Sequence, residues 1–218
     1  MARHFQKELE KVKKMILSLG AMVEERVRQS WKAIETIDPA IARQIVKTDH
    51  EIDEMEVEIE EECLKIMALH QPVAIDLRFL IAVIKINNDL ERIADEAVNI
   101  AERITTLDKY RTEKFFFDYG PMAAEVEEML KLSLDALVNM DVDLAFKVVT
   151  MDDEVDDIHR QAYRLIREEM TGHPEQIIFL MNYYLISRHL ERIADHATNI
   201  AEEVIYLIEG EIVRHAQY

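Results

Sequence analysis

The chain has 218 residues, with 26 Lys and Arg against 44 Asp and Glu, and therefore a net charge of -18 at pH 7. Such a charge opposes binding to the phosphate backbone of nucleic acids or to an anionic membrane, and it favours metal cations or basic protein surfaces. Only four Gly and four Pro occur beside 32% charged residues, which is too little turn chemistry for a many-stranded fold. Composition therefore predicts an all-α protein with long helices.

The single cysteine, Cys63, cannot form an internal disulfide bond, and its position between Ile59 and Ile66 on an apolar helix face predicts a core thiol. A reduced, cytoplasmic protein is expected from this. The first eight residues are charged throughout, unlike a signal peptide, and the longest uncharged run, 176–187, is shorter than a membrane-spanning helix. We therefore expect no membrane insertion.

Helical periodicity predicts six long helices in chain order, at about 3–36, 38–69, 72–107, 120–140, 141–171 and 174–209. Asp38 followed by Pro39 is a strong start signal, because the aspartate caps free backbone N–H groups and proline suits the first helical turn. Asp141 supplies the same capping residue to the fifth helix. Pro72 separates the second helix from the third.

The chain also contains an internal repeat. Residues 90–95, Leu-Glu-Arg-Ile-Ala-Asp, return 100 positions later at 190–195, and residues 23–25, Val-Glu-Glu, return 103 positions later at 126–128. Three long helices joined by short turns must pack antiparallel to bury their apolar stripes. The sequence thus predicts two tandem three-helix bundles, in residues 1–110 and 111–218.

Each repeat carries two pairs of carboxylates whose members are four residues apart, so each pair lies on one face of its helix. If the second and third helices of a repeat are neighbours, four carboxylates meet in the groove between them. Carboxylate oxygens suit hard cations such as Mg, Mn or Ca. The predicted metal ligands are Asp49, Asp53, Glu91 and Asp95 in the first repeat, and Asp152, Asp156, Glu191 and Asp195 in the second.

Three histidines of the second repeat stand where the first repeat has acidic residues. His159, His189 and His196 occupy the positions of Glu56, Asp89 and Glu96. This exchange predicts that the second metal site can include nitrogen ligands that the first site lacks.

Two other functions use the same residues. The acidic stripes can dock on a basic partner without any metal, as a structural adaptor does. A metal-dependent hydrolase or oxidase is the other alternative, but a ferritin-like di-iron site needs two Glu-x-x-His motifs and the nearest match is the single Asp156-x-x-His159. The chain has no Gly-rich phosphate loop and no nucleophile elbow. We therefore expect a protein that is not an enzyme.

The doubled motif at 90–102 and 190–202, Leu-Glu-Arg-Ile-Ala-Asp-x-Ala-x-Asn-Ile-Ala-Glu, with Gln-Pro-Val-Ala-Ile-Asp-Leu-Arg at 71–78, resembles the PhoU family of bacterial phosphate-uptake regulators. The similarity covers essentially the whole chain. Family members often have Gly where Ala94 and Ala194 stand, and alanine is the better helix former.

The resemblance implies a cytoplasmic, non-enzymatic regulator that restrains phosphate uptake and phosphate-starvation signalling when phosphate is plentiful. The partners it implies are the ATPase subunit of the phosphate ABC transporter and its sensor histidine kinase. It also implies multinuclear iron or zinc sites at the eight acidic residues named above. A homodimer is expected as well, and no nucleic acid partner.

Overall fold

The computed structural model describes residues 2–110 and 116–210, with side chains from His4 onward. This part of the chain forms seven α-helices and no strand: α1 (Ala2–Thr36), α2 (Pro39–Lys47), α3 (His50–His70), α4 (Ala74–Leu107), α5 (Gly120–Asn139), α6 (Val142–Gly172) and α7 (Ile177–Glu209). Two 3₁₀ turns, Asp108–Tyr110 and Pro174–Gln176, follow α4 and precede α7. The all-α prediction is confirmed.

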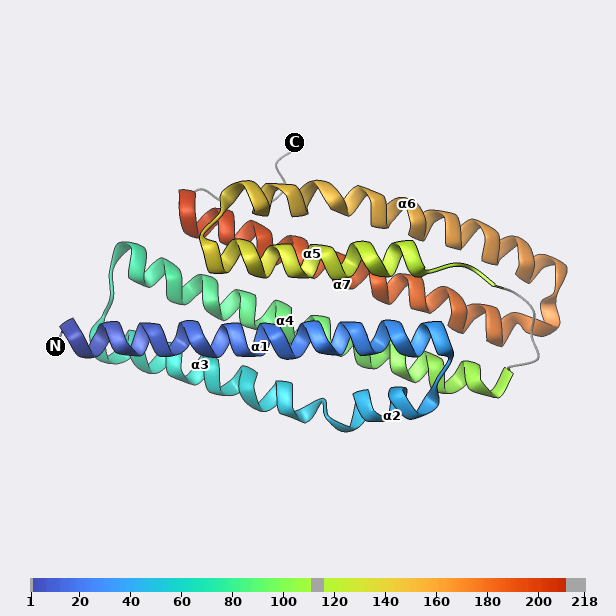
Figure 1. Cartoon of the computed structure of the whole chain (residues 1–218), viewed down its shortest axis with the longest axis horizontal. Coiled ribbons are helices and arrows are strands. Elements are labelled where there is room, and N and C mark those ends of the chain that lie inside the picture. The colour runs from blue at the N-terminus through green and yellow to red at the C-terminus, as the bar shows by residue number, and fades with distance from the viewer. Residues whose placement is uncertain (1, 111–115, 211–218) are drawn as a thin grey trace.

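The helices form two antiparallel three-helix bundles that lie side by side (Figure 1). The first contains α1, the α2–α3 pair and α4, and the second contains α5, α6 and α7. The bundles meet mainly where α4 and α7 run antiparallel along each other, and their buried residues form one continuous hydrophobic core. The predicted pair of three-helix bundles is confirmed, while the boundary between residues 110 and 111 stays a prediction because residues 111–115 lie outside the described part.

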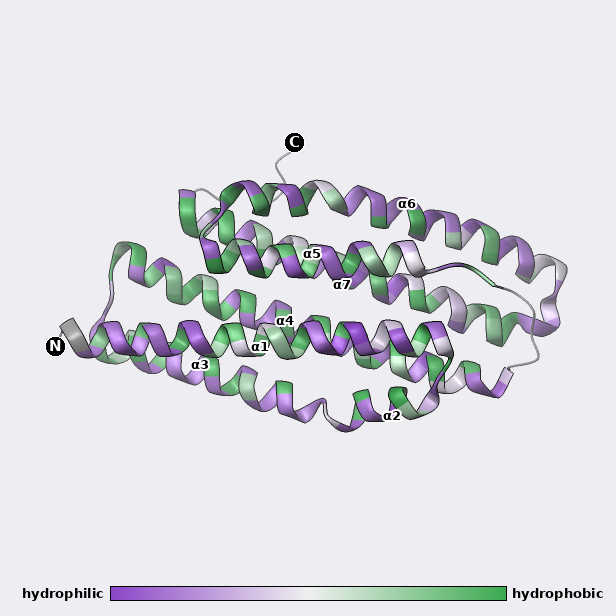
Figure 2. Cartoon of the chain, viewed as in Figure 1, coloured by the Kyte–Doolittle hydropathy of each residue, from purple (hydrophilic) through white to green (hydrophobic). Residues whose placement is uncertain are grey.

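The apolar stripes predicted from periodicity face this core. Figure 2 shows helices with one hydrophobic and one hydrophilic side, and Val12, Leu19 and Val23 of α1 are fully buried. Cys63 is fully buried too, and burial raises the pKa of its thiol to about 12, which confirms it as a core residue. No helix in the described residues is both long and apolar enough to cross a bilayer.

Both predicted aspartate caps are present. Asp38 has an extended backbone, and its side chain accepts a hydrogen bond from the backbone N of Ala40 at 2.7 Å. Asp141 accepts from the backbone N of Asp143 and Leu144 at 3.0 and 3.1 Å. These bonds satisfy N–H groups that the first turn of a helix leaves without a backbone partner.

Gly20 in the middle of α1 marks a close approach between the bundles. A Cβ atom at this position would lie 3.0 Å from Cδ2 of Leu134 on α5. Glycine weakens a helix by about 1 kcal/mol relative to alanine, and here it lets the backbone of α1 pack directly against a side chain of the second repeat.

The single helix predicted for 38–69 is wrong in one respect, because the chain breaks into α2 and α3 at Thr48. The buried Arg26 of α1 donates hydrogen bonds to the backbone O of Ile45 and, at 3.2 Å, of Thr48. The first bond satisfies a carbonyl group at the end of α2. The second adds to the hydrogen bond that the carbonyl of Thr48 accepts from the backbone N of Glu51 at 3.3 Å. Met129, 103 positions after Arg26, offers no such donor, and α6 runs unbroken.

Replacing Arg26 with the residue of the second repeat tests this explanation. We expect Arg26→Met to lower the free energy of unfolding by about 2 kcal/mol, because the carbonyl group of Ile45 loses its side-chain donor and the bundle loses a buried, charge-assisted hydrogen bond. Urea denaturation followed by circular dichroism measures the change. The matched control is Arg28→Met on the exposed face of the same helix, which should alter stability by less than about 0.5 kcal/mol. Equal effects of the two substitutions would contradict a capping role for Arg26.

Candidate functional site

The first acidic groove lies between α3 and α4, which pack against each other. Asp49 immediately precedes α3, Asp53 lies in its first turn, and Glu91 and Asp95 come from α4. Burial raises the pKa of Asp49, and the charges of Asp53 and Asp95 raise it further. Burial and the charge of Asp95 likewise raise the pKa of Glu91. The structure therefore brings together all four predicted residues of the first repeat.

Two carboxylate oxygens in this groove are buried without a hydrogen bond, namely Oδ1 of Asp49 and Oε2 of Glu91. A buried acceptor without a donor costs about 1 to 3 kcal/mol of stability. The negative charge of this groove is therefore only partly compensated by the protein. Arg92 relieves part of this charge, since its Nε lies 3.4 Å from Oε2 of Glu91 and its Nη1 lies 3.4 Å from Oδ2 of Asp95. The unsatisfied carboxylate oxygens favour binding of a cation here, and Arg92 competes with that cation for Glu91 and Asp95.

The second groove repeats the arrangement between α6 and α7. Burial, followed by the charges of Asp195 and Asp156, raises the pKa of Asp152 to about 6. Burial and the charge of Glu191 raise the pKa of Asp195 to about 6 as well. Arg160 pairs with Asp156, with Nη1 at 3.1 Å from Oδ2. All four predicted residues of the second repeat therefore also share one groove.

A surface hollow of about 480 Å³ lies beside this second groove and is lined in part by Glu191 and Asp195. The carboxylates are the ligand type that hard cations prefer, and two buried oxygens of the first groove, Oδ1 of Asp49 and Oε2 of Glu91, have no hydrogen-bond donor and could accept a cation. Among residues 2–110 and 116–210, however, no three His, Cys, Asp or Glu side chains are already gathered closely enough to hold one ion. Metal binding would require the side chains to rotate inward.

Two of the three histidines predicted as nitrogen ligands contact the other repeat instead. Nδ1 of His189 lies 2.7 Å from Oε2 of the buried Glu96 on α4, and Nε of Arg192 lies 2.9 Å from Oε1 of the same carboxylate. The packing of α4 against α7 turns the side chain of His189 towards the first repeat, and its role as a nitrogen ligand stays a prediction.

His196 makes the corresponding contact further along α7. Its Nδ1 lies 2.9 Å from Oδ1 of Asp89, which also accepts a hydrogen bond from Asn199 at 3.2 Å. His196 also lines the hollow beside Glu191 and Asp195, and its role as a nitrogen ligand stays a prediction. His159 instead lies 3.1 Å from the hydroxyl of Ser187 through Nδ1, and its role as a ligand stays a prediction.

This polar network between the repeats was not predicted from the sequence. Positions 89 and 96 are acidic in the first repeat, and positions 189 and 196 are histidines. Because α4 and α7 are antiparallel, Asp89 meets His196 and Glu96 meets His189. The exchange of acid for histidine was visible in the sequence, and antiparallel pairing of the two copies would have explained it.

Known proteins are similar to this chain in sequence over both repeats. The PhoU domain family matches residues 16–104 and 120–204. The chain is 38% identical over 216 residues to the phosphate-specific transport system accessory protein PhoU homolog of Pseudomonas aeruginosa, covering 99% of this chain and 89% of that protein. It is 39% identical over 209 residues to the homolog of Aquifex aeolicus, covering 96% and 95%.

Solved structures are similar throughout the chain as well. The crystal structure of PhoU from Pseudomonas aeruginosa has a TM-score of 0.91 at 38% identity and covers 95% of this chain and 100% of that chain. The crystal structure of the phosphate transport system regulatory protein PhoU from Streptococcus pneumoniae has a TM-score of 0.86 at 30% identity, covering 96% and 99%.

Proposed function

The chain belongs to the PhoU family, and we propose that it is a cytoplasmic, metal-binding regulator of phosphate uptake and phosphate-starvation signalling. The relatives support an accessory, regulatory role in phosphate transport. No enzyme family is indicated by the matches, in agreement with the non-enzymatic interpretation of the sequence. The family match over both repeats is the observation that carries the proposal.

The proposed partners are the ATPase subunit of the phosphate ABC transporter and a sensor histidine kinase. Exposed apolar side chains support a role in protein contacts, because they often mark interaction surfaces. One such group lies around the end of α3 and the start of α4, where Leu69 is 67% exposed, Val73 is 75% exposed and Ile75 is 62% exposed. We propose that the regulator acts by binding these partners through its helical surfaces.

The proposed metal ions are held by Asp49, Asp53, Glu91 and Asp95, and by Asp152, Asp156, Glu191 and Asp195. Iron or zinc is proposed from the family resemblance, with Mg, Mn or Ca as alternatives. A cation in either groove would neutralise the crowded carboxylates and would fix one helix of the repeat against the next. The support for this proposal is the presence of the same acidic groove in both repeats.

Pull-down experiments test the partner half of the proposal. The purified chain should retain the transporter ATPase subunit and the cytoplasmic part of the kinase, each offered separately. Elemental analysis of the chain purified without chelators tests the metal half. Failure to retain either protein would contradict the adaptor role, and absence of iron, zinc or any other metal would contradict metal binding.

Arg92 and Arg160 favour a second candidate, because each already neutralises part of one groove. In this candidate the acidic faces dock on a basic partner and no ion is bound. Reversal of charge at Glu91 and Asp95 should then weaken binding of that partner in a salt-dependent way, whether or not EDTA is present. Binding that disappears in EDTA would favour the metal-dependent adaptor.

We also propose that the chain forms a homodimer. The exposed apolar side chains around the start of α4 support this, because a second copy could cover them. Sedimentation velocity at micromolar concentration tests the proposal, and a mass of one chain at all concentrations would contradict it.

A further inference from the structure

The first helix is longer than its counterpart in the second repeat. α1 has 35 residues and α5 has 20, and α5 begins at the position equivalent to Leu17. The first fifteen residues of α1 therefore form an extension that α5 lacks. One side of this extension packs into the core through Leu9, Val12 and Ile16. Its other side is exposed and has no counterpart in the second repeat.

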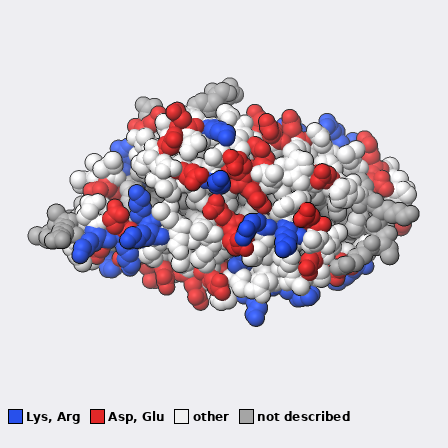
Figure 3. All heavy atoms as spheres, viewed as in Figure 1, with Lys and Arg blue, Asp and Glu red and all other residues white. Residues whose placement is uncertain are grey.

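This extension carries a charge opposite to that of the protein as a whole. Residues 7–14, Lys-Glu-Leu-Glu-Lys-Val-Lys-Lys, contain four lysines in a chain with a net charge of -18. Lys7, Lys11 and Lys14 follow each other at spacings of four and three, so they lie along one face of α1. Figure 3 shows Lys and Arg side chains gathered at this end of the molecule, over the N-terminal part of α1.

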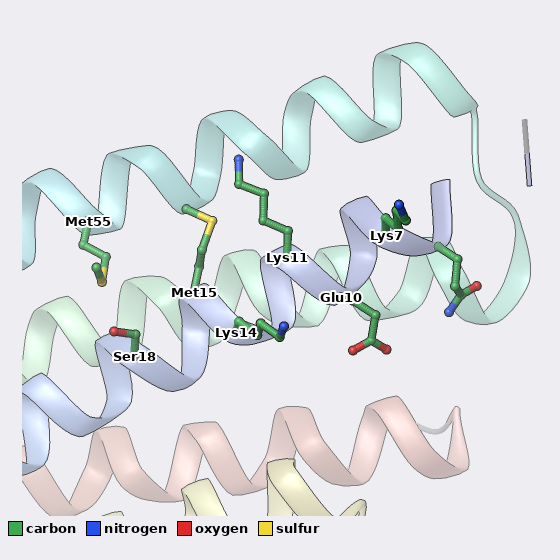
Figure 4. A pocket seen from close by; sticks show the side chains of 8 residues that line it. Lys7, Glu10, Lys11, Lys14, Met15, Ser18 and Met55 are labelled. Atoms are coloured by element: carbon green, nitrogen blue, oxygen red, sulfur yellow. The ribbon is translucent and has the colours of Figure 1, made fainter. Parts of the chain in front are cut away.

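The same three lysines line a surface groove of about 620 Å³. Figure 4 shows Lys11 extending towards α3, while Met15 from α1 and Met55 from α3 approach each other beside it. All three lysines are exposed. The groove therefore combines a row of ammonium groups with an apolar floor made by two methionines.

Two of the three ammonium groups have no partner among the residues that the structure describes. Nζ of Lys11 lies 3.0 Å from Oε2 of Glu62 on α3. The side chains of Lys7 and Lys14, by contrast, form no ion pair or hydrogen bond with any residue that the structure describes. Glu10 also borders the groove, and Figure 4 shows its carboxylate on the side of α1 away from α3, where Lys14 also lies. With Lys11 paired to Glu62, the lining keeps Lys7 and Lys14 against the single carboxylate of Glu10, and so a net positive charge that an external anion can neutralise.

We propose that this groove binds a linear anion of three or more linked phosphate groups, either a free inorganic polyphosphate or the triphosphate chain of a nucleotide. Lys7 and Lys14 are two helical turns apart, or about 10 Å along the axis. One phosphate group cannot reach both, whereas a chain of phosphates lying along α1 contacts Lys7, Lys11 and Lys14 in turn. Lysine is suited to this role because it binds phosphate oxygens as a compact point charge with three donors.

The net negative charge of the protein does not prevent an anion from binding at the three lysines, but it disfavours binding of the same anion elsewhere on the surface. At physiological ionic strength, charges farther than about 8 Å away are largely screened. The acidic grooves therefore act weakly on an anion held in contact with the three lysines. Over the rest of the surface the excess of acidic residues opposes non-specific binding of the same anion.

Isothermal titration calorimetry of the full chain tests the proposal, in EDTA and at about 150 mM salt, where surface charges are screened as in the cell. Tripolyphosphate should bind saturably at one site, and orthophosphate and sulfate should bind at least about tenfold more weakly, because each reaches fewer lysines. The double substitution Lys7→Gln and Lys14→Gln should weaken tripolyphosphate binding by about tenfold. Lys32→Gln, at an exposed site on the same helix, should leave binding unchanged.

Two further arms separate the source of the phosphate chain and the role of metal. If ATP without magnesium binds more tightly than tripolyphosphate, the proposal is supported with a nucleotide as the ligand. The tighter binding would come from contact of its base with Met15 and Met55. ATP that binds no better supports it with free polyphosphate as ligand. The double substitution Asp152→Asn and Asp195→Asn should leave tripolyphosphate binding intact, so this inference can fail or succeed independently of the proposed metal-binding function.

Three results would overturn the proposal. These are no saturable binding of tripolyphosphate, binding that the Lys7→Gln and Lys14→Gln substitutions do not weaken, and equal affinity for sulfate and tripolyphosphate. The substituted side chains are exposed, and unchanged circular dichroism of the double variant would establish that any loss of binding arises from the groove.

Discussion

Glu96→Ala is expected to lower the free energy of unfolding by about 2 kcal/mol, because the buried carboxylate loses its contacts with His189 and with the half-exposed Arg192 of the other repeat. The carboxylate of Glu96 is only 5% exposed and is held between His189 and Arg192. It joins α4 to α7, the longest contact between the two repeats. Urea denaturation at pH 7 measures the loss, which should appear as a single lower midpoint because the two bundles share one core.

A neighbouring carboxylate provides the control. Glu102 lies on the same helix, is 54% exposed and pairs with Arg103, so Glu102→Ala should change stability by less than about 1 kcal/mol. A loss in Glu96→Ala no larger than that in Glu102→Ala would contradict a stabilising role for the contact between the repeats.

The same contact should respond to pH in a known direction. Burial by itself raises the pKa of Glu96, but the hydrogen bond and charge of His189, with Asn99 and Arg192, outweigh it, and the pKa is lowered. A carboxyl group with a lowered pKa in the folded state stabilises the protein above its unfolded pKa of about 4.3, and this stabilisation is lost as pH falls through the lower folded value. The difference between wild type and Glu96→Ala should therefore shrink below about pH 4.

Local sequence signals were enough to predict most of the fold. The caps at Asp38 and Asp141 depend on residues next to them in the chain, and both lie where the sequence placed them. The break between α2 and α3 was missed because its cause, Arg26, lies on another helix and reaches the carbonyl groups only after the bundle has formed. A signal confined to 38–69 could not reveal it.

The acidic grooves were predictable for the same reason, and the histidine contacts were not. Spacings of four residues place Asp49 with Asp53, and Glu91 with Asp95, on single helix faces, so only the adjacency of α3 and α4 had to be assumed. The direction of His189 depends instead on which face of α7 meets α4. Packing between the apolar faces of the two helices determines which face of α7 contacts α4. This contact cannot be predicted from the sequence of one repeat alone.

Metal should stabilise the chelator-treated protein at pH 7, and Asp152→Asn should reduce that effect while stabilising the metal-free protein. Burial and neighbouring carboxylates raise the pKa of Asp152 and of Asp195 to about 6. A raised carboxyl pKa means that ionisation costs more in the folded than in the unfolded state. The metal-free protein should therefore lose stability as pH rises from about 4 to about 6, and it should stay less stable at pH 7.

Scanning calorimetry of EDTA-treated protein, with and without added iron or zinc, measures both effects. A metal present at about 100 times its Kd should stabilise the wild type by about 3 kcal/mol. Asp152→Asn removes one of the crowded charges, so without metal its Tm should exceed that of the wild type at pH 7 and equal it near pH 4. Asp157→Asn, at a carboxylate 69% exposed on the same helix, should leave both the Tm and the gain from metal close to wild type.

The two grooves should differ in this experiment because their arginines are used differently. Arg92 remains on Glu91 and Asp95 of its own groove, whereas the equivalent Arg192 reaches across to Glu96. Arg160 partly neutralises Asp156 in the second groove, but Asp152 and Asp195 form no ion pair with any residue that the structure describes. Burial and neighbouring carboxylates raise the pKa of both to about 6, so a metal ion has uncompensated charge to neutralise there. Asp152→Asn should remove more of the gain from metal than Asp49→Asn does. If Asp49→Asn removes as much or more, then Arg192 is not what distinguishes the two grooves.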